Sequence, residues 1–390
     1  MLKNTVQKTV TEVIFAMIYR NCFIFTGKGF EKGSFETENG YFKNVDASAS
    51  SVGEDLEGRY VIPGLIDVHT HGNSGADFSD GDYNGLKKMA RYLAENGITS
   101  FCPTSLTLPY EVLDKSFKNA LRLKNEAPKG HSKVAGINME GPFFAESRKG
   151  AQNVLHLRLP DYDAFKDLYD ACEGLISIVD VAPELEGAME FIGKANKLCT
   201  VSVAHTDCSY DDAKEAFEKG ARQLTHLYNA MPSLHHRKPG PIAAGAERDD
   251  VKAELISDGQ HVHPAMVRLA FNIFGADRIC LISDALRCCG MPDGLYDLGG
   301  QEVELKDNVA RLTSDGNIAG SATNLFLCMK KAVSFGIPLP DAIRAATLNP
   351  AEAIGRQNEI GSIDKGKRAD FIICSKDFDL ISVYIDGEKV

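Results

Sequence analysis

Residues 61–71 read VIPGLIDVHTH, an apolar run that ends in Asp67, His69 and His71. The run has the length and the continuous apolar character of a strand that is buried on both faces. His69 and His71 are two residues apart, so their side chains point to the same face of such a strand. Two imidazoles at the carboxyl end of a buried strand predict a site for a divalent metal.

Seven further apolar runs follow, and helical patterns such as GLKKMARYLAENG at 85–97 separate most of them. The runs end at TSFCPTS, VAGINMEGP, ISIVDVAPE, CTVSVAHT, RQLTHLYNA, KAELISDGQ and RICLISDA. Eight buried strands that alternate with helices predict the α/β class and a (β/α)8 barrel of the TIM type. A doubly wound sheet is the alternative, but it needs a glycine-rich loop between its first strand and a helix. TGKGFEKG at 26–33 has no helix after it and is predicted to be a turn.

Both ends of the chain differ from the middle because they read as short strands joined by tight turns. Asn-Gly at 39–40 and Asp-Gly at 386–387 are typical of two-residue β-hairpin loops. We therefore expect a small β-sandwich domain built from residues 17–60 and 355–390, and a metal-dependent hydrolase barrel at 61–354. Residues 1–16 are predicted to form a separate amphipathic extension.

Composition excludes several classes of partner. The 390 residues carry 43 basic and 54 acidic side chains, a net charge of −11, which argues against nucleic acid and anionic membranes. No window has the roughly 18 apolar residues of a membrane span. The ten cysteines are irregularly spaced and contain no C-x-x-C pair, so we expect reduced core thiols and a cytoplasmic protein.

Polar side chains recur where the apolar runs end, namely Glu140, His205, His226, Asp258, His261, His263 and Asp284. In a (β/α)8 barrel these ends converge on the face that carries the active site. Imidazoles and carboxylates from separate strands suit zinc best here, with iron, manganese or cobalt as alternatives. Asp284 closes the last barrel strand and is the candidate acid/base; its alternative role is a turn or helix-cap aspartate.

A second cluster, SLHHRK at 233–238, is the densest local positive charge in this acidic chain. Arg237 is suited to bidentate contact with a phosphate or carboxylate, so the segment is predicted to be an anion clamp. A solvated loop without a ligand is the alternative.

The order PGLIDVHTHG, NMEGPF, AHT, THLYNAM, DGQHVH and LISDA resembles the N-acetylglucosamine-6-phosphate deacetylases of the amidohydrolase superfamily. The resemblance extends from about Met17 to nearly the end of the chain. It implies a barrel with a small β-sandwich, and a reaction that releases acetate from N-acetylglucosamine 6-phosphate in amino-sugar catabolism. One or two divalent metals per subunit are expected.

The resemblance also implies a role for individual residues. Glu140, His205 and His226 correspond to the ligands of the main metal, and Asp284 corresponds to the catalytic acid/base. Asn229, Ala230 and His261 correspond to substrate-binding positions. Arg237 corresponds to a phosphate-binding arginine that reaches the active site of the neighbouring subunit, which implies a homodimer.

Two positions depart from the pattern of the family. His69 and His71 are both present although some members replace this pair, so a second metal bridged by Glu140 is an alternative to a single metal. Gln152 stands where relatives often carry a histidine. It is assigned to substrate binding as an amide donor, with His156 as an alternative.

Other functions compete with this interpretation. Another amidohydrolase, acting on a cyclic amide or a related acylated sugar phosphate, is the first alternative. The third barrel strand ends in Glu140 and offers no lysine for carboxylation, which argues against a hydantoinase. A catalytically inactive barrel that only binds a sugar phosphate is the second alternative, and the complete set of expected ligands argues against it.

Overall fold

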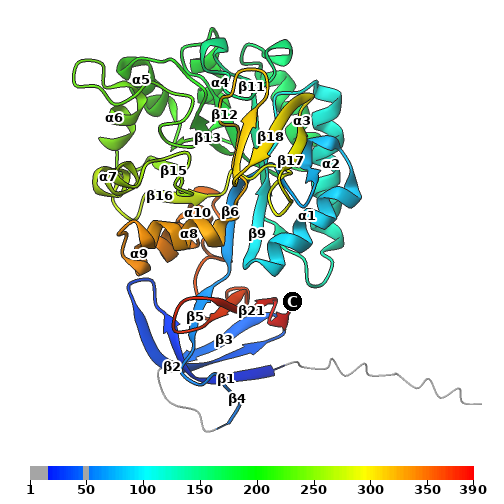
Figure 1. The fold of residues 1–390 in the computed structure, drawn as a ribbon, viewed down its shortest axis with the longest axis vertical. Coiled ribbons are helices and arrows are strands. Elements are labelled where there is room, and N and C mark those ends of the chain that lie inside the picture. The colour runs from blue at the N-terminus through cyan, green and yellow to red at the C-terminus, as the bar shows by residue number, and fades with distance from the viewer. Residues whose placement is uncertain (1–15, 47–51) are drawn as a thin grey trace, which may run out of the picture.

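The computed structural model describes residues 16–46 and 52–390. The predicted extension at 1–16 lies outside the described residues, apart from Ala16. The described chain forms a barrel surrounded by helices, and a smaller sheet lies beside the end of the barrel at which β6 begins (Figure 1).

The barrel contains eight parallel strands in chain order. They are β6 (Leu65–Thr70), β9 (Ile98–Pro103), β11 (Ile137–Phe143), β12 (Ile176–Val181), β13 (Thr200–Val203), β14 (Gln223–Leu224), β15 (Lys252–Ile256) and β16 (Ile279–Ile282). The short β10 (Lys133–Val134) pairs with β9. Parallel bridges between Thr104 and Asn138 and between Thr70 and Ala285 join the two sheets into a closed ring. The predicted (β/α)8 barrel is confirmed.

Ten α-helices belong to the described part of the chain, most of them on the outside of the barrel (Figure 1). They are α1 (Tyr83–Glu95), α2 (Tyr110–Glu126), α3 (Tyr162–Ala171), α4 (Ala188–Ala195), α5 (Tyr210–Lys219), α6 (Gly240–Ala246), α7 (Pro264–Phe274), α8 (Leu325–Ser334), α9 (Leu339–Ala345) and α10 (Leu348–Ala353). Side-chain caps begin several of them: Asp82 caps α1 and Ser209 forms a capping box on α5. In α1 the buried Leu86, Met89 and Leu93 recur at helical spacing and face the barrel core.

The smaller sheet unites both ends of the described chain. Its strands are β1 (Ala16–Phe25), β2 (Phe30–Glu38), β3 (Tyr41–Asp46), β4 (Glu54–Asp55), β5 (Tyr60–Pro63), β20 (Phe371–Cys374), β21 (Leu380–Ile385) and β22 (Glu388–Lys389). Phe35 of β2 packs edge-on against Phe371 of β20, with 5.0 Å between ring centroids. Asn39 and Gly40 both have positive φ, 51° and 85°, as the two-residue turn requires. The two ends of the chain therefore build one β unit, whereas the limits at 60 and 354 stay predictions.

A three-stranded antiparallel insertion follows the last barrel strand and was absent from the sequence-based expectations. It consists of β17 (Gly294–Leu298), β18 (Gln301–Lys306) and β19 (Val309–Leu312). Its buried face, including Leu298 and Leu305, packs with Leu106 and Leu286, which follow β9 and β16. The insertion therefore covers part of the carboxyl end of the barrel.

Short elements complete the loops. They are β7 (Gly72–Asn73), β8 (Ala76–Asp77) and the 3-10 helices η1 (Phe78–Asp80), η2 (Glu146–Arg148) and η3 (Val154–His156). All ten cysteines lie in the described residues and are free thiols. Among these residues, none of the helices combines the length and the apolar character needed to cross a membrane.

Candidate metal centre and active site

Six of the predicted residues meet at the carboxyl end of the barrel. His69 lies in β6 and Glu140 in β11. His71 is the first residue after β6, and His205, His226 and Asp284 each lie two residues after the end of β13, β14 and β16. All six side chains are buried. They form two groups, which we call the Glu140 set (Glu140, His205, His226) and the Asp284 set (His69, His71, Asp284).

In the Glu140 set, one carboxylate oxygen faces two imidazoles. Glu140 Oε1 lies 3.2 Å from Nε2 of His205 and 3.2 Å from Nε2 of His226. The two Nε2 atoms are only 3.1 Å apart. Three ligand atoms from three strands therefore converge on one point, as a metal site requires.

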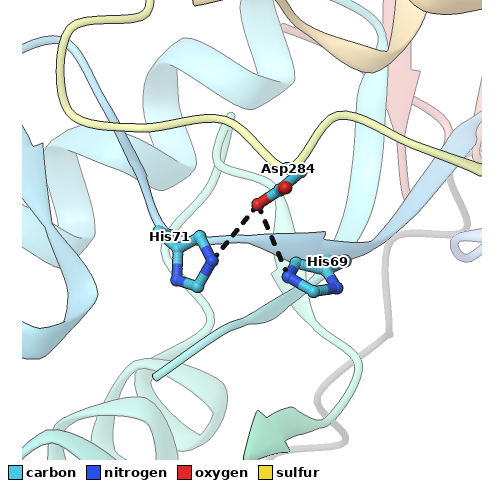
Figure 2. Close-up of side chains that lie close together, drawn as sticks. All are labelled: His69, His71 and Asp284. Atoms are coloured by element: carbon cyan, nitrogen blue, oxygen red, sulfur yellow. Dashed lines mark ion pairs between the residues drawn. The ribbon is translucent and has the colours of Figure 1, made fainter. Parts of the chain in front are cut away.

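The Asp284 set lies next to it (Figure 2). Asp284 Oδ1 lies 3.2 Å from Nε2 of His71 and 3.5 Å from Nε2 of His69. The second oxygen of Glu140, Oε2, is 3.3 Å from Nε2 of His71. Glu140 thus stands between the two sets, in the position that a bridging carboxylate would occupy.

Hydrogen bonds at the far side of two rings orient the imidazoles of His71 and His205. Nδ1 of His71 faces the carbonyl oxygen of Thr104 at 3.2 Å, and Nδ1 of His205 faces that of Arg148 at 2.8 Å. A carbonyl only accepts, so Nδ1 carries a hydrogen in both rings, and Nε2 is the nitrogen whose lone pair binds a cation when that nitrogen is unprotonated. His69 Nε2 is buried and has no hydrogen-bond partner among the described residues. Lone pairs and carboxylate oxygens that converge in this way fit a divalent cation.

Burial and neighbouring charges act against each other in this centre. Burial opposes ionisation of Glu140, but the two imidazoles of its set outweigh this effect and lower the pKa of the carboxyl well below its usual value. Burial likewise opposes a charge on Asp284, and the two histidines of its set lower its pKa. Both carboxyl groups are therefore ionised near neutral pH and favour a cation.

The backbone is strained where three of these side chains attach. His205, His226 and Asp284 have φ angles of 44°, 31° and 49°, in the left-handed region that non-glycine residues rarely adopt. Such conformations cost about 1–3 kcal/mol each and persist where the surrounding structure enforces them. The turn after the strand thus directs each side chain inward, and Asp284 is not a helix cap.

A cavity of about 180 Å³ opens onto the centre. Its lining includes Gln152, Asn229, Ala230 and His261, four of the five residues predicted to bind substrate, together with the apolar Leu106, Leu286, Leu298 and Ile318. Leu298 belongs to the insertion, so an element that was not predicted forms one wall of the site.

Two of the predicted substrate residues already hold protein partners. Gln152 Oε1 accepts from the backbone N–H of Thr107 at 2.8 Å, which directs its Nε2 to Glu140 Oε2 at 2.6 Å. His261 lies between Asp258 Oδ2, 2.8 Å from Nδ1, and the carbonyl oxygen of Ala319, 2.7 Å from Nε2. Burial disfavours a charge on His261, but Asp258 outweighs it and raises the pKa of the imidazole.

Other residues singled out in the sequence lie away from the centre. Arg237 is on the exposed segment 233–238, outside the cavity of its own chain, with Nη1 2.8 Å from Nε2 of His236. His263 caps α7, because its Nδ1 accepts from the backbone N–H of Ala265. His156 belongs to η3 and does not line the cavity.

Sequence reasoning missed two buried carboxylates in the barrel interior. Glu254 Oε2 lies 2.9 Å from Nδ1 of His69, and Asp180 Oδ1 accepts from Thr225 Oγ1 at 2.9 Å. Burial, reinforced by Glu254 and Glu140, raises the pKa of Asp180 well above its usual value. The sequence contains a signal for both residues, because each places an acidic side chain in an otherwise mostly apolar strand: Glu254 in KAELI and Asp180 in ISIVDV.

Comparison with known proteins identifies the family. The sequence profile of the amidohydrolase family matches residues 60–390. N-acetylglucosamine-6-phosphate deacetylase of Vibrio furnissii is 35% identical over 332 residues, which are 85% of this chain and 82% of that protein. N-acetylgalactosamine-6-phosphate deacetylase of Escherichia coli O157:H7 is 33% identical, with coverage of 86% and 88%.

Similarity to solved structures indicates the same family as the sequence comparisons do. A mutant N-acetyl-D-glucosamine-6-phosphate deacetylase from Mycobacterium smegmatis, in complex with N-acetyl-D-glucosamine-6-phosphate, has a TM-score of 0.91 and 31% identity. The match covers 96% of this chain and 99% of that one. Because profile, sequence relatives and fold coincide over nearly the whole chain, it belongs to the amidohydrolase family, in the branch of the N-acetylglucosamine-6-phosphate deacetylases.

Proposed function

We propose that the chain hydrolyses the N-acetyl group of N-acetyl-D-glucosamine 6-phosphate to D-glucosamine 6-phosphate and acetate. The observation that carries this proposal is the position of Glu140 between two sets of histidines, with Asp284 facing the same point. Hydrolysis of an amide near neutral pH needs an activated water and a group that transfers its proton. The histidines and carboxylates would hold a cation that activates the water, and Asp284 would transfer the proton.

Glu140, His205 and His226 would hold the main divalent metal, and His69, His71 and Asp284 would hold a second one. When bound, such a cation acts as a Lewis acid that acidifies water and polarises a carbonyl. We propose zinc as the metal, because four imidazoles with carboxylates suit it, although iron, manganese and cobalt accept the same ligands.

Asp284 carries the proton transfers. Its ionised carboxylate takes one proton as the water oxygen bonds to the amide carbon, and it then delivers that proton to the nitrogen. The carbon–nitrogen bond breaks as the nitrogen is protonated, so the amine and acetate leave. The lowered pKa of Asp284 keeps its carboxyl group ionised before the reaction begins.

Substrate contacts and assembly complete the proposal. Asn229, Ala230 and His261 line the cavity and would hold the sugar and the acetyl group, whereas Gln152, which also lines it, would act through its hydrogen bond to Glu140. Arg237 is exposed and outside the cavity of its own chain, which suits the proposal that it binds the phosphate in the site of a second subunit. The active form would then be a homodimer, and we place it in the cytoplasm because its ten cysteines are free thiols.

N-acetylgalactosamine 6-phosphate is the second candidate substrate, because a relative of 33% identity is named for it. The two sugars differ only in the configuration of one hydroxyl group. The same metal centre would serve both reactions.

The decisive experiment measures release of acetate from both phosphorylated sugars and from unphosphorylated N-acetylglucosamine, before and after chelation. We expect chelator-sensitive turnover of a phosphorylated sugar and little turnover without the phosphate. Equal rates with and without the phosphate would contradict the role of Arg237. Failure to release acetate after metal is restored would contradict the deacetylase itself.

A further inference from the structure

Glu254 is a fully buried carboxylate beneath the metal centre. It lies in β15, and each of its oxygens has a protein partner. Oε1 accepts from Gln223 Nε2 at 2.7 Å. Oε2 accepts from the backbone N–H of His226 at 3.3 Å and lies 2.9 Å from Nδ1 of His69. Burial of an acidic group is costly, so a specific use is expected for it.

These contacts determine which nitrogen of His69 faces the metal centre. Both oxygens of Glu254 act as acceptors, so Nδ1 of His69 carries the hydrogen and donates it. Nε2 is then the nitrogen with a free lone pair, and it is the buried atom without a hydrogen-bond partner among the described residues. A carboxylate behind a metal-bound imidazole fixes the tautomer and the ring orientation and makes the ligand more basic.

Glu254 also connects the two halves of the centre. Through His69 it supports the Asp284 set, and through the backbone of His226 it contacts the Glu140 set. We infer that Glu254 is a positioning residue that holds His69 as a ligand and thereby determines whether the second metal is bound. This inference rests on the proposed two-metal centre.

The test measures metal binding instead of catalysis. Metal-free wild-type protein, E254M and E254Q are titrated with Zn²⁺ against a competing chelator, and the number and affinity of bound ions are determined. In E254M we expect the second ion to bind about 10–100-fold more weakly, whereas the first ion binds as in the wild type. E254Q keeps an acceptor for His69 but loses the charge, so a smaller loss is expected.

D180N is the matched control, because Asp180 is equally buried in the barrel and contacts Thr225 instead of a histidine. We expect it to bind both ions like the wild type. If E254M does not fold, the metal affinity of E254Q tests the inference, because a glutamine side chain has nearly the same shape as glutamate. The inference is overturned if the second ion binds with equal affinity to the wild type and the Glu254 variants. It is also overturned if D180N loses as much affinity as E254M, or if the wild type binds only one ion.

Acetate release, measured on the same samples, separates the two proposals. Wild-type protein that binds two ions and releases no acetate contradicts the proposed function and leaves the role of Glu254 supported by its metal affinities. If the wild type releases acetate and E254M binds metal as the wild type does, the proposed function is supported and the inference about Glu254 is overturned.

Discussion

Asp284 is the residue on which the proposed proton transfers depend. Replacing it with asparagine keeps the size of the side chain but removes the carboxylate that faces His69 and His71. We expect kcat for acetate release to fall by about 10²–10⁴-fold, because loss of a general acid/base has this magnitude. D180N, which removes a buried carboxylate without histidine contacts, should retain activity. A D284N enzyme with near-normal turnover would show that the acid/base is elsewhere.

Gln152 offers a second test at the same scale. Both ends of its amide are engaged, with Thr107 and with Glu140, so we expect it to act through Glu140. Q152M should lower kcat and weaken metal retention, by about 10–100-fold, with little change in KM. The predicted substrate role would instead raise KM at constant metal content, and steady-state kinetics with metal analysis distinguishes the two outcomes.

Among the elements, the insertion β17–β19 adds most to what was expected. The segment GLYDLGGQEVELKDNVARL contains two hairpin signals, Gly-Gly and Asp-Asn, and its structure places Gly299, Gly300, Asp307 and Asn308 at positive φ. Alternation of Val303 and Leu305 with charged residues gives the buried face. These local signals make the insertion itself predictable, whereas the surface on which it packs comes from loops after β9 and β16.

Leu298 connects this element with the active site. L298A removes a buried side chain from the core under the insertion, and we expect the free energy of unfolding to fall by about 2–5 kcal/mol. L295A is the matched control, because Leu295 lies on the same strand and is 61% exposed. Urea denaturation followed by circular dichroism compares them; similar losses in both variants would contradict the packing described for Leu298.

At the scale of the whole molecule, we predict that the two subunits of a homodimer share their active sites, with Arg237 of each subunit completing the site of the other. D284N and R237M each damage a different part of the site, so each homodimer should be nearly inactive towards the phosphorylated sugar. In a mixed dimer, the R237M subunit keeps Asp284 and receives Arg237 from its partner, which restores one complete site. Random pairing should therefore recover about a quarter of the wild-type activity.

Co-expression or mixed refolding, followed by the acetate assay, measures this recovery. If Arg237 served its own chain, every site of the mixture would contain one defect and no activity would return. Light scattering on the wild type provides the independent check, with an expected mass of twice one chain.

The sequence by itself determined the eight barrel strands, the β character of both ends and the six polar residues that meet at the candidate metal centre. These features follow from local patterns: apolar runs, hairpin dipeptides and polar residues directly after a strand. Parallel strands in a closed barrel bring their carboxyl ends together, so position in the strand was sufficient to predict that His69, Glu140, His205 and Asp284 would meet.

Only the tertiary structure decided which atoms face one another. Glu254 and His69 are 185 residues apart, and their pairing depends on which side chains point inward at the same level of the barrel. The engagement of Gln152 with Glu140 and the position of Leu298 in the cavity wall likewise depend on loops that meet in space. A local pattern specifies the periodicity of an element but not its partner, because the partner is selected by packing and barrel closure.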